Sequence, residues 1–499
     1  MPLPDDDMPD LLYSAAQVRA LDAALIAAGT DGFELMQRAA HGAWRALRRR
    51  WPEAGEITVL TGHGNNAGDG FLMAALARRA GWAVTVFAVG DTSALNGDAA
   101  SALAEARAAQ VDILPWLPGV ALRGVLVDAL LGTGLKGAVR APYAEAIEAI
   151  NGSGQPVLAV DIPSGLCADT GQALGQAVHA DLTVTFIGLK FGLFSGQAAD
   201  HVGQLLFDSL QADAAIVAAS PAVARRLSPA SLPRPAPRPM TAHKGQYGQV
   251  LVIGGDHGTG GATLMSAEAA LRSGAGMVSL VTRAEHVAAA LTRLPEVMTL
   301  GVHSSNQLLD PLDKADVLVV GPGLGQASWG RSLLSIAATG SQAQVWDADA
   351  LNQLAQGLVR LPAGSIITPH PGEAARLLGV TTAQVQADRA HAALALAKKF
   401  SAICVLKGAG SLVAAPDGRL ALCAHGHPAM ATAGLGDVLA GVLGALLAQH
   451  LAPYDAACLG VWLHARAGEQ QGVNGRGLAA TDLIPAIRQL FEELSPCLK

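Results

Sequence analysis

Residues 56–81 read EITVLTGHGNNAGDGFLMAALARRAG, an apolar strand over 56–62, a glycine-rich turn over 62–70 and an amphipathic helix over 71–81. Glycine lets the backbone turn tightly and approach a ligand closely, and the first N–H groups of the following helix have no partner within that helix. Such a turn is suited to bind an anion. Alone, it is only a loose dinucleotide-binding fingerprint, and a plain strand-to-helix turn explains many such matches.

The rest of the first half repeats this alternation of apolar strands and alanine-rich helices. Continuous apolar strands joined by helices indicate a parallel sheet that is covered on both faces. The sequence therefore predicts a Rossmann-like three-layer α/β domain, with its site at the carboxyl ends of the strands. The further expected strands are residues 83–90, 124–132, 156–165 and 181–188, and the further helices are 142–150 and two within 11–50.

The second half has the same style and predicts a second α/β domain. A strand followed by a hairpin around Asp417 and Gly418 is expected over 401–424, and a long helix is expected to begin near Gly436. The remaining expected strands are residues 248–255, 276–283, 316–325, 344–351 and 364–373.

A proline-rich segment separates the two halves. Five prolines between Pro229 and Pro239 exclude a regular helix or a central strand there, so this segment is expected to be a semi-rigid extended spacer. A chain of 499 residues also exceeds what one hydrophobic core usually serves. The expected domains are residues 1–218 and 241–499, with the linker over 219–240.

Composition and charge exclude several classes of protein. Hydrophobic residues make up 51% and charged residues 15% of the chain, which rules out a disordered chain or a coiled coil. A net charge of −7 without a dense basic stretch disfavours nucleic acid as a partner. The five cysteines form no CxxC pair and favour a reducing compartment, and the apolar stretch from Val438 falls short of a membrane span. We therefore expect a cytoplasmic protein without a membrane partner.

Polar side chains gather where the strands of the first half end. A carboxylate buried at a strand end is a candidate acid, base or ligand, and amides and hydroxyls add further oxygen donors. For any one of these residues a helix cap or a turn is an equally good explanation, but coincidence explains several on neighbouring strands less well. The residues are Asn65, Asn66 and Asp69 in the turn, Asp128 in VDALLGTGLKGA (127–138), and Asp161 and Ser164 in VDIPSG (160–165).

In the second half, ATAGLGDVLAG over residues 431–441 runs a glycine loop directly into a helix. The free amides of Gly434 to Gly436 would bind a transferring phosphoryl group, and Asp437 would take a proton from an attacking hydroxyl. For an isolated motif, electrostatic stabilisation of the helix N-terminus by Asp437 is an equal explanation. The supporting motifs are VVGPGLG (319–325), TPHPGE (368–373) with His370, LKGAGSLV (406–413) with Lys407, and the glycine loop within 243–262.

The motifs of the first half, in this order and spacing, resemble the epimerase domain of NAD(P)H-hydrate repair enzymes over most of residues 11–215. Ala67 replaces a glycine of the family's usual NNGGDG, so position 67 must avoid a positive φ. The resemblance implies that Asp161 contacts the hydrated ring and acts in catalysis, and that Asn66, Asp128 and Ser164 bind potassium. It also implies substrate contacts from Asn65, Asn66, Ala67, Gly68 and Asp69 and from Gly132, Thr133, Gly134, Leu135, Lys136, Gly137 and Ala138.

The motifs of the second half resemble the ribokinase-like fold, and more narrowly the dehydratase domain of the same repair enzymes, over about 240–495. The resemblance implies ADP as co-substrate, split to AMP and phosphate, with magnesium as a helper and Asp437 as the catalytic base. The implied substrate contacts are Ala262, Gly325, His370 and Asp437, and the implied nucleotide contacts are Lys407, Gly408, Ala409, Gly410, Ser411 and Gly436.

Together the two resemblances imply an enzyme that interconverts the (R) and (S) hydrates of NADH and NADPH (NADHX and NADPHX) and dehydrates the (S) form. They also imply a homo-oligomer. Two other interpretations stay open at this point. One is a ribokinase-like kinase of a vitamin-like alcohol that uses ATP and carries an accessory domain, and the other is a first domain that only senses nucleotides or serves as a scaffold.

Overall fold

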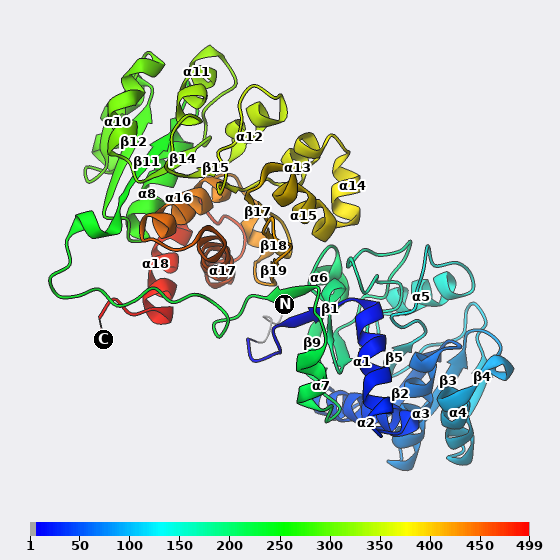
Figure 1. Ribbon diagram of the computed structural model, residues 1–499. Coiled ribbons are helices and arrows are strands. Elements are labelled where there is room, and N and C mark those ends of the chain that lie inside the picture. The colour runs from blue at the N-terminus through cyan, green and yellow to red at the C-terminus, as the bar shows by residue number, and fades with distance from the viewer. Residues whose placement is uncertain (1–5, 499) are drawn as a thin grey trace. The chain divides into compact units, whose positions relative to one another are not determined.

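The computed structural model describes residues 6–498 and forms two compact units, Met1–Arg225 and Arg226–Lys499 (Figure 1). Each unit contains a largely parallel sheet between helices, so the α/β class predicted for both halves is confirmed. The proline-rich segment is partly packed, since it contains β10 (Ala224–Arg226) and the buried Leu227 and Leu232. Within residues 6–498, no helix is long and apolar enough to cross a membrane.

The sheet of unit 1 is built around β2 (Glu56–Thr61), the strand that precedes the glycine-rich turn. Its strand order is β4-β3-β2-β5-β6-β7-β9, and all neighbouring pairs are parallel. The strands that carry the predicted site residues are therefore adjacent and end at one edge of the sheet. The other strands are β3 (Ala83–Ala88), β4 (Asp112–Pro115), β5 (Val125–Ala129), β6 (Val157–Val160), β7 (Leu182–Phe186) and β9 (Gln204–Asp208).

Helices cover both faces of this sheet, which confirms the predicted three layers. The helices α1 to α4 pack on the face that carries Val59 and Val127, whereas α5 packs on the face that carries Leu60 and Leu126. Figure 1 shows α3 and α4 side by side beneath this sheet. The helices are α1 (Ala15–Ala27), α2 (Gly32–Arg50), α3 (Asn65–Arg79), α4 (Gly97–Ala108) and α5 (Tyr143–Gly152).

Short elements complete unit 1. The strand β1 (Leu11–Tyr13) pairs in parallel with β8 (Leu189–Lys190) and antiparallel with β10, so that the beginning of α1 lies near Lys190. The remaining elements are α6 (Ala198–His201), α7 (Ala214–Ala219) and the 3-10 helices η1 (Thr92–Ala94) and η2 (Phe191–Leu193).

The sheet of unit 2 follows the order β13-β12-β11-β14-β15-β16-β17-β18-β19. The pairs from β13 to β17 are parallel, and β18 and β19 form the predicted antiparallel hairpin around Asp417 and Gly418. Its strands are β11 (Gln249–Ile253), β12 (Met277–Thr282), β13 (Met298–Gly301), β14 (Val317–Val320), β15 (Ala343–Trp346), β16 (Ile366–Ile367), β17 (Ile403–Leu406), β18 (Ser411–Ala414) and β19 (Leu420–Cys423).

The predicted long helix near Gly436 is α16 (Leu435–Ala448), which is almost entirely buried. Together with α8, α17 and α18 it packs on one face of the sheet, and α10, α11 and α15 contact the strands from the other face. The other helices of unit 2 are α8 (Gly260–Arg272), α9 (Val287–Arg293), α10 (Leu309–Lys314), α11 (Ser328–Ala337), α12 (Ala348–Ala355), α13 (Pro371–Leu378), α14 (Thr382–Ala387), α15 (Arg389–Phe400), α17 (Pro453–Gly472) and α18 (Leu483–Leu494), with 3-10 helices η3 (Lys244–Tyr247), η4 (Ala284–His286), η5 (Ser305–Leu308), η6 (Pro428–Met430) and η7 (Ala480–Asp482).

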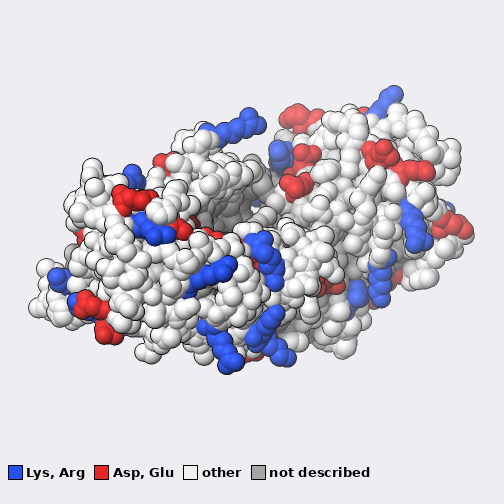
Figure 2. Space-filling model, turned by 90° about the horizontal axis from the view of Figure 1, so that it is seen from above, with Lys and Arg blue, Asp and Glu red and all other residues white. Residues whose placement is uncertain are grey.

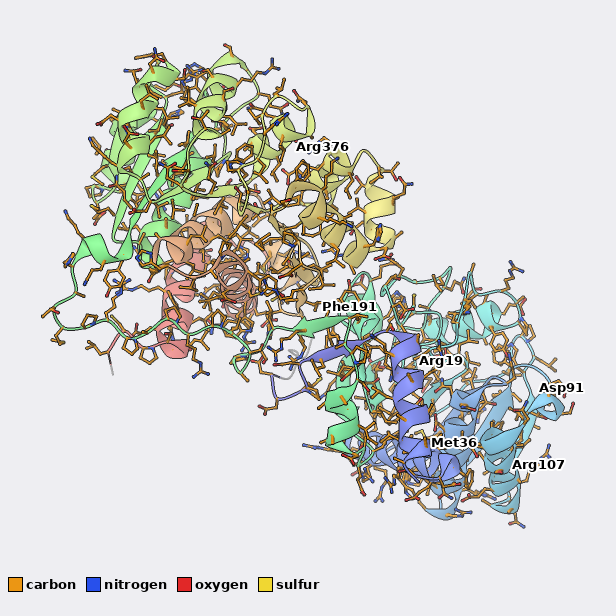
Figure 3. All side chains as sticks on the ribbon, in the orientation of Figure 1. Arg19, Met36, Asp91, Arg107, Phe191 and Arg376 are labelled. Atoms are coloured by element: carbon orange, nitrogen blue, oxygen red, sulfur yellow. The ribbon has the colours of Figure 1, made fainter. Side chains whose placement is uncertain are left out.

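The helix after the glycine-rich turn begins earlier than residue 71, where the sequence placed it. It begins at Asn65, and its internal glycines serve close packing rather than turning. A Cβ at Gly68 would lie 2.5 Å from Met36 Sδ of α2, which is labelled in Figure 3, and a Cβ at Gly70 would lie 2.6 Å from Ala129 Cβ. Ala67 lies within this helix, so position 67 avoids a positive φ, as the methyl group of alanine requires.

Three strands near the sheet edges, β4, β9 and β13, were not predicted. Their residues are mostly exposed or half-buried, so these strands lack the continuous apolar run that marked the central ones. The surface seen in Figure 2 is mostly uncharged, with basic and acidic side chains in small groups of both signs, as a chain with 15% charged residues requires.

Candidate active sites

In unit 1, Asp128 and Ser164 form a buried pair at the ends of β5 and β6. The Asp128 carboxylate accepts hydrogen bonds from the Ser164 hydroxyl at 2.6 Å and from the Ser164 amide at 2.7 Å. Burial raises the pKa of Asp128 to about 6, although the hydrogen bonds from Ser164 lower it. The Ser164 hydroxyl also contacts the backbone of Leu131, the residue that precedes the predicted phosphate loop.

Asn66 lies in the first turn of α3, next to that loop. Its side chain is buried, and neither its Oδ1 nor its Nδ2 has a hydrogen-bond partner among the described residues. A Cβ at Gly132 would lie 3.3 Å from Asn66 Cβ, so the loop packs directly against it. The structure thus links Asn66, Asp128 and Ser164 through residues 131–132. A buried amide without a partner calls for an explanation such as a bound ion.

Asp161 follows β6 in the left-handed backbone conformation, with φ of 67°. Its side chain is 18% exposed, and its Oδ1 accepts a hydrogen bond from the ammonium of the almost fully buried Lys190. Lys190 donates further hydrogen bonds to Thr185 Oγ1 at 2.9 Å and to the Phe186 carbonyl at 3.1 Å. The candidate proton-transfer group therefore has a fixed cationic partner that sequence motifs had not indicated.

Two more carboxyl groups interact with the ion pair of Asp161 and Lys190. Asp69 of α3 and Asp22 of α1 both interact electrostatically with Lys190 and Asp161. Burial raises the pKa of Asp22 to about 6 and, with the negative charges of Asp161 and Asp22, raises that of Asp69 well above its usual range. Three carboxyl groups and one ammonium group thus meet at the carboxyl edge of the sheet.

The predicted phosphate loop, residues 132–138, is largely exposed. A Cβ placed on Gly134 or Gly137 would meet no heavy atom of the described chain within 4 Å, so the backbone is open to a ligand. Arg19 of α1, labelled in Figure 3, donates a hydrogen bond to the Thr133 carbonyl at 3.3 Å. The loop and the carboxyl cluster are thus both bordered by α1.

In unit 2, glycine-rich loops meet at the carboxyl ends of adjacent strands. A Cβ at Gly254, after β11, would lie 2.1 Å from the Pro322 carbonyl oxygen, and one at Gly325, after β14, would lie 2.5 Å from Asp256 Oδ2. The predicted Gly325 therefore lies beside the loop that precedes α8, and Ala262 lies in the first turn of that helix. Side chains would not fit between these loops.

Lys407 lies beneath the N-terminus of α16. Its ammonium donates a hydrogen bond of 2.7 Å to the buried Asp347 carboxylate, which also accepts one of 2.8 Å from Thr368. A Cβ at Gly436 would lie only 3.0 Å from Lys407 Nζ and 3.3 Å from Asp347 Oδ2. The structure therefore brings two of the predicted nucleotide contacts, Lys407 and Gly436, together.

Two further acids surround this pair. Burial raises the pKa of Asp437 to about 7 and that of Glu373 to about 7, and in both cases Asp347 raises the pKa while Lys407 lowers it. His370 caps α13, with its Nδ1 accepting the Gly372 amide at 3.0 Å, and burial followed by Lys407 lowers the pKa of His370. Neutral His370 and two carboxyl groups poised near pH 7 thus border the α16 N-terminus.

The loop 407–411 is held from below by the buried Arg389. Its Nη2 donates hydrogen bonds to the carbonyl oxygens of Leu406, Lys407 and Gly410 at 3.2–3.4 Å. Ser411 Oγ closes the loop with a hydrogen bond of 2.9 Å to the Gly408 carbonyl. Gly408 and Ala409 remain exposed, so the backbone of this loop is both fixed and accessible.

Sequence reasoning missed Lys190, Asp22, Asp347, Glu373 and Arg389. Each acts through a residue distant in sequence. Glu373 lies in the quoted TPHPGE and Asp347 in the quoted strand at 344–351, but neither was assigned a role. A lysine within the apolar run at 186–194 was the one available signal for Lys190.

Two family profiles match the chain. One, described as YjeF-related protein N-terminus, matches residues 32–192, and the other, described as NAD(P)H-hydrate dehydratase, matches residues 250–489. The first match lies within unit 1 and the second within unit 2.

Relatives and a solved structure agree with this order. A Coxiella burnetii protein named bifunctional NAD(P)H-hydrate repair enzyme is 45% identical over 484 residues, covering 96% of this chain and 99% of the relative. An Escherichia coli protein of the same name is 44% identical over 470 residues, covering 93% and 90%. The structure of a ribokinase-like superfamily protein from Enterococcus faecalis matches with a TM-score of 0.51 and 28% identity, covering 55% of this chain and 97% of that one. The ribokinase-like fold predicted for the second half is confirmed.

Proposed function

The chain belongs to the family of bifunctional NAD(P)H-hydrate repair enzymes, and from this we propose that unit 1 interconverts the (R) and (S) hydrates of NADH and NADPH. Unit 2 dehydrates the (S) form at the expense of ADP. The order of the two activities makes chemical sense, because spontaneous hydration yields both epimers and the dehydratase accepts one of them.

The epimerase site lies at the carboxyl edge of the unit 1 sheet. The loops 65–69 and 132–138 bind the dinucleotide, and the second of them presents open backbone to its phosphates. Asp161 lies against the hydrated ring and moves the proton that inversion requires. Its fixed orientation by Lys190 supports this role.

Potassium fits the buried group formed by Asn66, Asp128 and Ser164. The unpartnered Asn66 Oδ1, the Asp128 carboxylate and the Ser164 hydroxyl are oxygen donors of the kind that an alkali cation takes. A bound cation would supply positive charge next to loop 132–138 and the phosphates of the substrate. The buried, unpartnered amide is the observation that supports this site.

In unit 2, Asp437 accepts the proton of the substrate hydroxyl. The oxygen of this hydroxyl attacks the β-phosphorus of ADP, and AMP leaves. The free amides at the N-terminus of α16 and the Lys407 ammonium face the phosphoryl oxygens and stabilise their charge. The C–O bond then breaks with phosphate as the leaving group, pushed by the ring nitrogen. Loss of a proton from the neighbouring ring carbon restores NAD(P)H.

Magnesium fits the carboxylates that lie beside Lys407. Among the described residues no three His, Cys, Asp or Glu side chains form a metal cluster, and Mg²⁺ usually binds through one or two carboxylates together with substrate phosphates. Asp347 and Glu373 would hold it there, and it would neutralise charge on the transferred phosphoryl group.

The meeting of Lys407, Asp347 and Asp437 at the N-terminus of α16 carries this proposal best. The test is an assay of the purified chain on mixed (R,S)-NADHX with ADP, and then with ATP, followed at 340 nm. Conversion of all the substrate with ADP supports both activities, whereas conversion of one epimer leaves only the dehydratase. No absorbance gain, with a stable phosphorylated product from ATP, would instead favour a small-molecule kinase.

Two variants separate the sites within that assay. Asp161→Asn is expected to abolish interconversion of the epimers while substrate binding persists, and dehydration of (S)-NADHX continues. Asp437→Asn is expected to abolish dehydration while nucleotide binding persists. A near-normal rate in either variant would refute the role of that aspartate.

We further propose a homo-oligomer located in the cytoplasm. The edge strand β13 exposes Met298 and Leu300, which supports a contact between copies. Light scattering on the purified chain would test the assembly, and fractionation of cells that express it would test its location.

A further inference from the structure

Lys190 is an unusual side chain for a site residue, because it is almost fully buried. Only 1% of its side chain is exposed, and its ammonium is satisfied on every side by Asp161 Oδ1, Thr185 Oγ1 and the Phe186 carbonyl. Thr185 Oγ1 also donates a hydrogen bond to Asp161 Oδ1 at 3.3 Å. Burying a lysine is costly unless it is paired, so this geometry indicates a specific role for the pair.

Charged groups from three elements interact with Asp161. They are Asp22 from α1, Asp69 from α3 and Lys190 from β8, and Arg19 of α1 in turn interacts with Asp22. Lys190 is the cation in direct contact with Asp161, and the two other carboxyl groups interact electrostatically with both members of this ion pair.

We propose that Lys190 is a positioning residue that holds the Asp161 carboxylate ionised and aimed at the substrate hydroxyl, so that Asp161 starts the reaction as a base. This inference rests on the epimerase activity proposed for unit 1. An ionised Asp161 selects between two routes of inversion, because loss of the hydroxyl would need an acid at this position whereas opening of the ring needs a base.

Ring opening by this route conserves both protons and electrons. Asp161 takes the proton of the hydroxyl, the oxygen forms a double bond to its carbon, and the bond from that carbon to the ring nitrogen breaks. The electron pair passes to the nitrogen, which receives the proton back from Asp161. Rotation of the aldehyde and the reverse steps close the ring on the other face, with Asp161 again ionised.

The test is the pH profile of kcat/KM for epimerisation of (R)-NADHX, after subtraction of the uncatalysed rate. In Lys190→Met the pH below which the rate falls is expected to rise by about 1–3 units, since a contacting cation lowers a carboxyl pKa by about that amount. Lys190→Arg keeps the charge and is expected to keep the profile of the unchanged chain. Arg45→Met, which removes an exposed cation paired with Asp208, is the matched control and is expected to leave the profile unmoved.

Thermal unfolding followed by circular dichroism reports whether unit 1 of each chain is folded, and dehydration of (S)-NADHX by the same preparations reports on unit 2. Should Lys190→Met fail to fold, Lys190→Met/Asp22→Asn restores the charge balance and is expected to show the same direction of shift. An acid limb that stays in place in either folded variant overturns the proposal, because a merely structural lysine would change the amount of active enzyme but not its titration. Absence of epimerisation in the unchanged chain would instead refute the proposed function.

Discussion

Asp437 is the proposed base of the dehydration, and burial raises its pKa to about 7. The acid form therefore predominates below that pH and cannot accept the hydroxyl proton. We predict that kcat/KM for dehydration falls about tenfold for each pH unit below 7 and levels off above it. Initial rates with ADP between pH 5.5 and 9 would measure this, and a profile that is flat down to pH 6 would contradict it.

The residue scale also shows what motifs can and cannot reveal. Asp161 and Asp437 were predicted because each follows an apolar strand or a glycine loop, and both lie at the edge of a sheet in the structure. Lys190 and Asp347 were not predicted because each pairs with a residue far away in the chain. Lys190 pairs with Asp161, 29 residues away, and Asp347 pairs with Lys407, 60 residues away. Pairing across such distances is decided by the order of strands, which no local pattern states.

At the scale of elements, α3 depends on glycines that permit close packing. A Cβ at Gly70 would meet Ala129 Cβ, Thr61 Cγ2 and Val59 Cγ1 within 3.2 Å, all of them on the rigid sheet. We predict that Gly70→Ala destabilises unit 1 by about 1–3 kcal/mol through overpacking. Chemical denaturation would measure the loss. Gly152→Ala in α5, where a Cβ would meet no atom of the described residues within 4 Å, is the control and should cost nothing.

Arg389 ties an element to a loop, since it anchors three carbonyl groups beneath residues 407–411. We predict that Arg389→Met raises KM for ADP more than it lowers kcat, because the loop loses its fixed backbone while Asp437 keeps its place. Titration of ADP at saturating (S)-NADHX would separate the two parameters. A fall in kcat alone would show that the loop acts on the chemical step instead.

At the scale of the whole molecule, each proposed site is assembled from residues of one unit. We predict that a mixture of the Asp161→Asn and Asp437→Asn chains converts all of (R,S)-NADHX, because (S)-NADHX released by one chain can diffuse to the other. Final absorbance at 340 nm would measure this. A mixture that leaves the (R) epimer behind would mean that substrate passes only within a chain.

The division into two α/β domains could be predicted from the strands that are buried. Central strands such as β6 and β14 are continuous apolar runs, so the two α/β halves followed from the sequence. The edge strands and the early start of α3 did not, because partial burial interrupts the apolar pattern and glycine ordinarily argues against helix. Tertiary packing against Met36 and Ala129 overrides that preference.

The buried amide of Asn66 has a practical consequence for anyone who handles the protein. Polar atoms enclosed without a partner destabilise a fold unless something from the buffer compensates them. Preparations exchanged into choline or lithium salts should therefore unfold earlier on heating than those kept in potassium salts. Reaction rates measured in different laboratories would then differ according to the cation present during purification.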